Sequence, residues 1–225
     1  ILILNAHRAE ARVSAAIYVF SVLIGFGTSA GYHRLARGAR SRRIMQRMDH
    51  STIFILIAGS YTPICLLALP RAWGIPLLSV IWAGAVLGIL LKQFAFNRLK
   101  ALEYALYPVL GWIVVVAAPV LWRGMTTVEL TLLVTGGVLY TVGIPVLVRG
   151  RPNPWPRTFG YHEIWHGFTV AAGVCHFATV GLLVAQLLAR AGAAQVIAVD
   201  PVAARRERAL RVGITHALHP DAVAS

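Results

Sequence analysis

The chain has 225 residues, of which 58% are hydrophobic and only 13% are charged, and its mean hydropathy is +0.70. Soluble domains usually carry about 25% charged residues, so the composition excludes an ordinary soluble protein and indicates one that crosses a membrane several times. A formal charge of +13 would suggest a nucleic-acid partner in a soluble protein. Here the basic residues cluster between apolar runs, which favours a role in membrane orientation and no nucleic-acid partner.

Six apolar runs approach the length of about 20 helical residues that is needed to cross the hydrocarbon core. They are residues 13–32, 51–70, 75–91, 104–122, 130–148 and 167–189. They predict an all-α membrane protein in which a bundle of six transmembrane helices occupies residues 13–189. Residues 190–225 return to a soluble composition and predict a soluble tail.

The basic residues predict how this bundle is oriented. Most of them lie in the first, third and fifth connections: Arg34, Arg37, Arg40, Arg42, Arg43, Arg47, Lys92, Arg98, Lys100, Arg149, Arg151 and Arg157. The positive-inside rule places such connections in the cytoplasm. We therefore expect a multi-pass protein of the plasma membrane, or of the inner membrane in a Gram-negative bacterium, with its Arg-rich loops inside the cell.

Five polar residues flank the apolar runs in a pattern typical of a metal site. His162 and His166, four residues apart, open the last run, and Ser29 and His33 repeat this spacing at the end of the first. Residues four apart share one face of a helix, and imidazole pairs of this kind are common zinc ligands. Asp49 precedes the second run, so the charge pattern places all five residues at the same, cytoplasmic depth.

Two other interpretations of these residues stay open. Histidines at helix ends are often only interfacial, and Asp49 can serve as an N-terminal helix acid. The segment from His162 to His166 also spells H-E-x-x-H, the metalloprotease signature in which Glu163 would be the general base. That motif needs a third ligand downstream, and the next acid, Asp200, lies beyond the last apolar run. We therefore rank a membrane protease below a zinc site shared between helices.

Three motifs, in order and in spacing, resemble those of the hemolysin III family, the bacterial branch of the progestin and adiponectin receptor superfamily. They are Ser29-x-x-x-His33, the stretch from Asp49 to Pro63, and His162-x-x-x-His166. The resemblance covers about residues 1–188 and implies a seven-helix bundle. The six apolar runs would then be helices 2–7, and residues 1–12 would be the remnant of a truncated first helix with the outer loop that follows it.

The resemblance also assigns roles to the polar residues. It implies that His33, His162 and His166 hold a zinc ion, with Asp49 and Ser29 placed around a water molecule at that ion. Zinc with three histidine ligands and one open position can activate water and polarise a carbonyl group. Asp49 would then act as the general base, and Ser29 would orient the water or bind an oxyanion.

These roles predict a zinc-dependent membrane hydrolase that acts on an amide or ester bond of a membrane lipid. The site would lie near the inner membrane interface, where such bonds are found. The alternative is a receptor-like or pore-forming, haemolytic membrane protein in which the zinc ion is structural and ties the helices together.

The tail carries a second resemblance. Residues 190–220 resemble part of the Rossmann domain of a medium-chain alcohol dehydrogenase, with Asp200 in the place of the acid that binds the cofactor ribose in that family. A glycine-rich phosphate loop should precede this acid, but an apolar run stands there instead. We therefore expect a fused fragment with a strand and a helix of marginal order, and no NAD binding.

Overall fold

The structure is a computed structural model, and it describes most of the chain. The described residues are 9–94, 100–155, 158–190, 197–211 and 214–223. Six helical segments in this part are long and apolar enough to cross a membrane, which confirms the all-α membrane fold expected from the apolar runs. The remnant helix expected at the start of the chain, at residues 1–4, lies outside the described residues.

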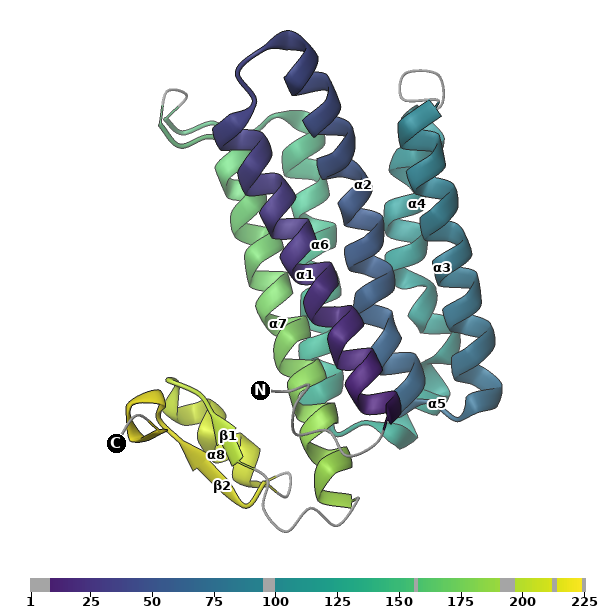
Figure 1. Cartoon of the computed structure of the whole chain (residues 1–225), viewed down its shortest axis with the longest axis vertical. Helices are drawn as coiled ribbons and strands as arrows, with labels where there is room; N and C mark the ends of the chain where they lie inside the picture. The colour runs from purple at the N-terminus through teal and green to yellow at the C-terminus, as the bar shows by residue number, and fades with distance from the viewer. Residues whose placement is uncertain (1–8, 95–99, 156–157, 191–196, 212–213, 224–225) are drawn as a thin grey trace.

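The helices of the bundle follow one another up and down (Figure 1). They are α1 (Ala9–Leu35), α2 (Ala39–Pro63) with the π-helical turn η1 (Ile64–Ala68), α3 (Arg71–Phe94), α4 (Lys100–Trp112) with the 3-10 turn η2 (Ile113–Ala117), α5 (Ala118–Gly124), α6 (Thr127–Arg149) and α7 (Tyr161–Arg190). Both non-α turns follow a proline, Pro63 or Pro108, within one or two helical turns. Neighbouring helices and local 3-10 or π turns make proline tolerable inside a membrane span.

The helix ends that flank the Arg-rich connections all lie at one end of the bundle (Figure 1). Here α1 ends and α2 begins, α3 ends and α4 begins, and α6 ends and α7 begins. We call this end the histidine end, because His33 lies in the last turn of α1 and both His162 and His166 lie in the first two turns of α7. Helix α7 ends at the opposite end of the bundle, and the tail follows it in the chain.

Helix α2 begins well before the apolar run that predicted it. The run starts at Ser51, whereas the helix starts at Ala39. The connection expected between the first two spans therefore shrinks to residues 36–38. The cause is that arginine is a good helix former, so the helix continues beyond the hydrocarbon core where the hydropathy no longer marks it.

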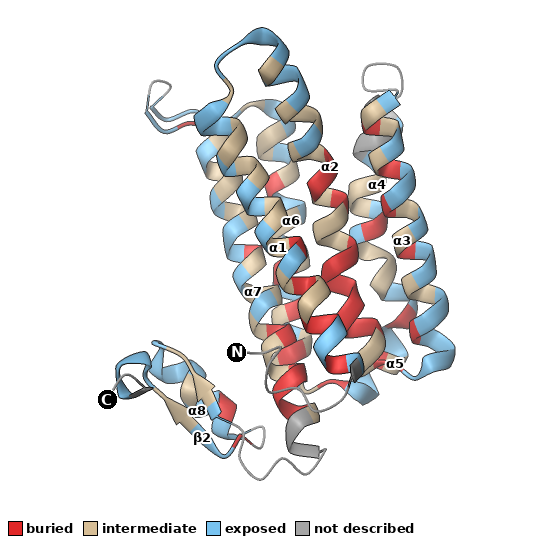
Figure 2. Ribbon diagram, in the orientation of Figure 1, coloured by how far each residue is buried: buried red, intermediate tan, exposed pale blue. Residues whose placement is uncertain are grey.

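Burial is greatest around α2, in the half of the bundle away from the histidine end (Figure 2). Phe54 of α2 is fully buried and stacks on Tyr107 of α4, with 4.4 Å between the ring centroids. A Cβ atom on Gly88 would lie only 2.4 Å from the Phe54 ring. Only glycine at this position lets α3 approach α2 so closely, and this contact fixes the helix that leads into the histidine end.

A fully buried acid, Glu129, joins α6 to α7 at the other end. Its Oε2 atom accepts hydrogen bonds from the Thr126 backbone N–H at 2.7 Å and the Thr126 hydroxyl at 2.8 Å, which completes a capping box at the start of α6. Its Oε1 atom accepts a hydrogen bond from the Gln186 side-chain amide at 2.9 Å. Both carboxylate oxygens are therefore paired, which compensates for the cost of burying them.

We expect Glu129→Ala to destabilise the bundle by about 2 kcal/mol or more, because it removes a helix cap and leaves donors of the half-buried Thr126 and the buried Gln186 without their acceptor. Chemical denaturation in detergent would measure the change. Glu163→Ala is the matched control, since Glu163 also bonds the backbone at the start of its helix but is exposed. Equal stability of the two variants would contradict the buried bridge.

The tail forms a small β-α-β unit in its described part. Strands β1 (Ile197–Val199) and β2 (His216–Leu218) are parallel, α8 (Ala203–Arg211) lies between them in sequence, and η3 (Pro220–Val223) follows. The expected strand and helix are present, and a second strand pairs with the first.

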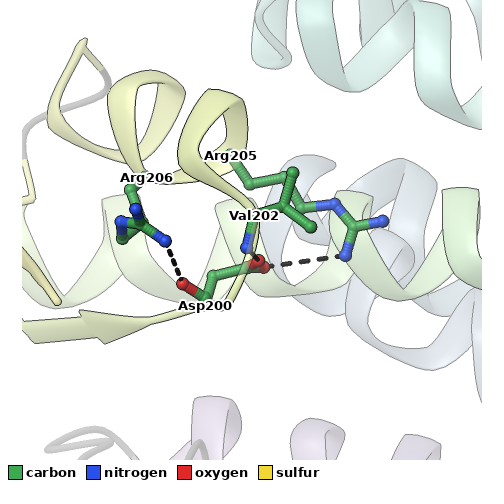
Figure 3. A network of polar contacts seen from close by, with 4 residues as sticks. All are labelled: Asp200, Val202, Arg205 and Arg206. Carbon is green, nitrogen blue, oxygen red and sulfur yellow. Dashed lines mark hydrogen bonds and ion pairs between the residues drawn. The ribbon is translucent and has the colours of Figure 1, made fainter. Parts of the chain in front are cut away.

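Asp200, at the end of β1, bonds with residues of the tail itself (Figure 3). Its Oδ1 atom accepts a hydrogen bond from the Val202 backbone N–H at 2.8 Å, and its Oδ2 atom lies 3.7 Å from the Arg205 guanidinium. Its backbone carbonyl accepts a hydrogen bond from Arg206 at 2.7 Å. This turn, in which an Asp side chain bonds the backbone two residues on, directs the chain into α8.

Candidate metal site

The three histidines are presented by the ends of two helices that are far apart in sequence. His33 belongs to the last turn of α1, and α7 is already helical at Tyr161. Because the helix includes both His162 and His166, the four-residue spacing places the two rings on one face, as the sequence predicts. The start of α7 is fixed by Glu163, whose Oε2 atom accepts a hydrogen bond from the Gly160 backbone N–H at 2.8 Å.

The ring nitrogens of these histidines converge. The Nε2 atoms of His162 and His33 are 3.3 Å apart, and those of His166 and His162 are 3.1 Å apart. One ligand atom from each of the three residues lies within 4.8 Å of the others. The three rings meet edge to face instead of stacking, with interplanar angles of 64°, 87° and 90°. The structure therefore brings together the three histidines that the sequence selects.

The spacing of these nitrogens fits a small divalent ion. Ligands bound tetrahedrally at about 2.0–2.1 Å from zinc lie about 3.3 Å from one another, and the two shorter separations here are 3.1 and 3.3 Å. Neutral imidazole also suits copper, nickel and iron. The donor set thus defines a three-histidine site able to hold a metal ion, with the ligands drawn from α1 and α7.

Asp49 and Ser29 lie near the cluster without joining it. In the described residues, the group whose ligand atoms meet contains the three histidines alone. Asp49 is half-buried on α2, and its carboxylate is close enough to interact electrostatically with His162. Ser29 is half-buried one helical turn before His33 on α1. The roles that the sequence assigns to Asp49 and Ser29 beside a metal ion stay predictions.

The H-E-x-x-H interpretation finds little support in this geometry. The third histidine comes from α1, through His33, and not from a residue downstream of His166. Glu163 is exposed and bonds the Gly160 backbone at the start of α7. Its observed role is therefore to cap the helix.

A second polar cluster beside the site was missed in the sequence. Lys92 is only 2% exposed, and its Nζ atom lies 6.0 Å from the centroid of the Tyr107 ring. The Tyr107 hydroxyl donates a hydrogen bond to the His50 backbone carbonyl at 3.1 Å, and the Gln93 side chain donates one to the Ser51 hydroxyl at 3.1 Å. The sequence had placed Lys92 in a loop, which was wrong because α3 continues past it to its end at residue 94.

The burial of Lys92 follows from the packing of α3 on α2. Lys92 is four residues after Gly88 and therefore lies on the same face of α3, the face that packs on α2 through Phe54. A basic residue at that register is expected to point inward, although its charge alone suggests a loop.

Fold and site together define the class: an integral membrane protein whose described part has six spanning helices, with three converging histidines at one end of the bundle. The family described as "Haemolysin-III related" matches residues 1–177. The chain therefore belongs to this family, as the three sequence motifs indicate.

Two relatives support the same assignment. The chain is 32% identical over 165 residues to the "Hemolysin-3 homolog" of Bacillus subtilis (strain 168), a match that covers 73% of this chain and 74% of that protein. It is 32% identical over 180 residues to "Hemolysin-3" of Bacillus cereus, with 79% of each chain covered.

Proposed function

We propose that this protein binds zinc through His33, His162 and His166 and hydrolyses an amide or ester bond of a membrane lipid. The observation that supports this most is the convergence of ring nitrogens, at 3.1 and 3.3 Å, although His33 and His162 are 129 positions apart in the chain. Packing alone gives no reason to gather three imidazoles with their nitrogens facing one another, whereas a shared metal ion does.

The depth of the site supports a lipid substrate. The histidines belong to terminal turns of spanning helices, so they lie near the edge of the hydrocarbon core, which is where lipid amide and ester bonds are found. The His33 side chain is exposed, which leaves the cluster open on one side. The excess of arginine at the same end supports a position in the cytoplasmic leaflet of the plasma membrane.

The hydrolysis would need the metal ion and two further side chains, those of Asp49 and Ser29. When bound, zinc would supply Lewis acidity, which polarises a carbonyl oxygen and makes water a better nucleophile at neutral pH. Asp49, beside His162, would accept the proton that the attacking water releases and return it to the leaving group. The Ser29 hydroxyl, one turn before His33, would donate a hydrogen bond to the oxyanion that develops on the carbonyl.

A second function is favoured by the name of one relative. The Bacillus cereus protein is named "Hemolysin-3", which suggests that it damages membranes. In that case the metal ion would act as a structural link between α1 and α7, and neither Asp49 nor Ser29 would have a chemical role.

One experiment separates these functions. We expect the purified wild-type protein to contain about one zinc ion per chain by elemental analysis, and to release fatty acid from at least one member of a panel of lipid N-acyl amides and acyl esters. Removal of the metal with a chelator should abolish this release, and added zinc should restore it. Bound zinc without any lipid cleavage, together with lysis of red blood cells, would instead support the structural role.

A further inference from the structure

Helix α2 projects beyond the part of the bundle that its apolar residues can bury in a membrane. It starts at Ala39, whereas the apolar run starts at Ser51. The ten residues before Asp49 therefore extend the helix by about 15 Å at the histidine end (Figure 1). This projecting segment is ordered helix, so its side chains occupy fixed faces.

Three arginines form one stripe along this segment. Arg40, Arg43 and Arg47 are spaced i, i+3 and i+7, which places them on the same face of α2. Arg40 and Arg43 are exposed. Arg47 is half-buried and donates a hydrogen bond to the Gln93 backbone carbonyl at 3.4 Å, so the stripe faces the side of α2 on which α3 ends.

The surroundings of the stripe are basic and partly apolar. The sequence contains no acidic residue from Arg34 to Met48. Ile44 and Met48, next to the stripe on the helix, are each 50% exposed. A helix that combines exposed arginines with exposed apolar side chains is typical of a segment lying at a lipid surface and not in bulk water.

The loop between α6 and α7 also indicates that the histidine end lies at the membrane surface. It emerges at the histidine end (Figure 1), and its Trp155 and Phe159 side chains are 64% and 43% exposed. The backbones of these two residues are paired, which holds the rings in place. Exposed tryptophan is characteristic of the headgroup level of a membrane, so this end of the bundle lies close to lipid phosphate groups.

We infer that the stripe of Arg40, Arg43 and Arg47 binds the phosphate headgroups of anionic phospholipids. Guanidinium groups match phosphate oxygens in geometry as well as in charge, and the exposed apolar side chains beside them suit the acyl region of the same lipids. This interaction surface is independent of zinc and of hydrolysis. If the arginines served only to orient the protein during insertion, the folded protein would show no preference among headgroups.

The test compares binding of phosphatidylglycerol and phosphatidylcholine to the purified full chain in a neutral detergent, by native mass spectrometry. We expect wild type to prefer phosphatidylglycerol. The double variant Arg40→Gln/Arg43→Gln should bind it roughly 25-fold more weakly, from about fivefold per arginine near a membrane surface. The control, Arg208→Gln/Arg211→Gln, removes two exposed arginines with the same spacing from α8 and should bind as wild type does.

Two further measurements keep the test decisive if the double variant proves unstable. The preference of wild type for phosphatidylglycerol should weaken as salt is raised, because exposed charges are screened, and inorganic phosphate at the same concentration as the lipid should displace little of it. The inference is overturned if wild type binds both lipids equally, if the preference does not depend on salt, or if the stable double variant keeps wild-type affinity. Complete displacement by inorganic phosphate would overturn it too, by showing a site for a free anion.

Discussion

Replacing His162 with alanine should remove the metal ion from the protein. Its Nε2 atom lies closest to both of the others, at 3.3 Å from that of His33 and 3.1 Å from that of His166, so it occupies the centre of the donor set. Two imidazoles on different helices remain, and we expect zinc affinity to fall by at least about 100-fold, because each ligand supplies several kcal/mol of the binding free energy. Elemental analysis after dialysis against a zinc buffer would measure the loss.

His50→Ala is the matched control for this experiment. His50 lies on α2, not on α7, and belongs to the neighbouring cluster, where its backbone carbonyl accepts a hydrogen bond from Tyr107. This variant should keep about one zinc ion per chain. If His162→Ala bound as much zinc as His50→Ala and wild type, the three histidines would not form a metal site.

Replacing Asp49 with asparagine should leave the zinc ion bound and reduce lipid hydrolysis by about 100-fold or more, the usual effect of losing a general base. Asparagine has nearly the same shape but cannot accept a proton. The variant therefore separates the chemical role of Asp49 from its effect on folding. Turnover of the best lipid in the panel, with zinc content measured on the same sample, would test this.

Glu163→Gln provides the comparison for Asp49→Asn. Glu163 is adjacent to His162 in sequence, yet its carboxylate is exposed and caps α7. Its amide variant should stay within a few-fold of wild-type activity. Loss of activity in Glu163→Gln with full activity in Asp49→Asn would reverse the two roles and revive the metalloprotease type of chemistry. Loss of zinc in Asp49→Asn would make Asp49 a ligand.

The spanning helices could be predicted from the sequence because the membrane imposes a simple condition on them. A run of about 20 apolar residues has few alternatives to a spanning helix, and each of the six runs lies largely within a helical segment of the structure. The helix ends were harder to predict. Outside the hydrocarbon core, hydropathy no longer distinguishes helix from loop. Residues 39–50 of α2 are helical because residues such as arginine favour helix.

The histidine cluster was also predictable, because two independent patterns coincided. The four-residue spacing placed His162 and His166 on one face, and the distribution of arginine placed His33 at the same depth. Lys92 and Glu129 could not be identified in this way. A charged residue near the end of an apolar run suggests a loop, and its burial depends on partners far away in sequence, such as Gln186 for Glu129. The parallel pairing of β1 with β2 likewise depends on a contact across α8.

The three histidines are divided between α1 and α7, and this division sets the order in which the proposed metal site can form. The ribosome delivers His33 to the membrane early, and more than a hundred further residues must be made before His166 follows. A nascent chain halted before α7 contains only one of the three histidines of the cluster, His33, and so lacks the complete donor set. The proposed binding of a metal ion would therefore be a late event, completed only when the final helix docks.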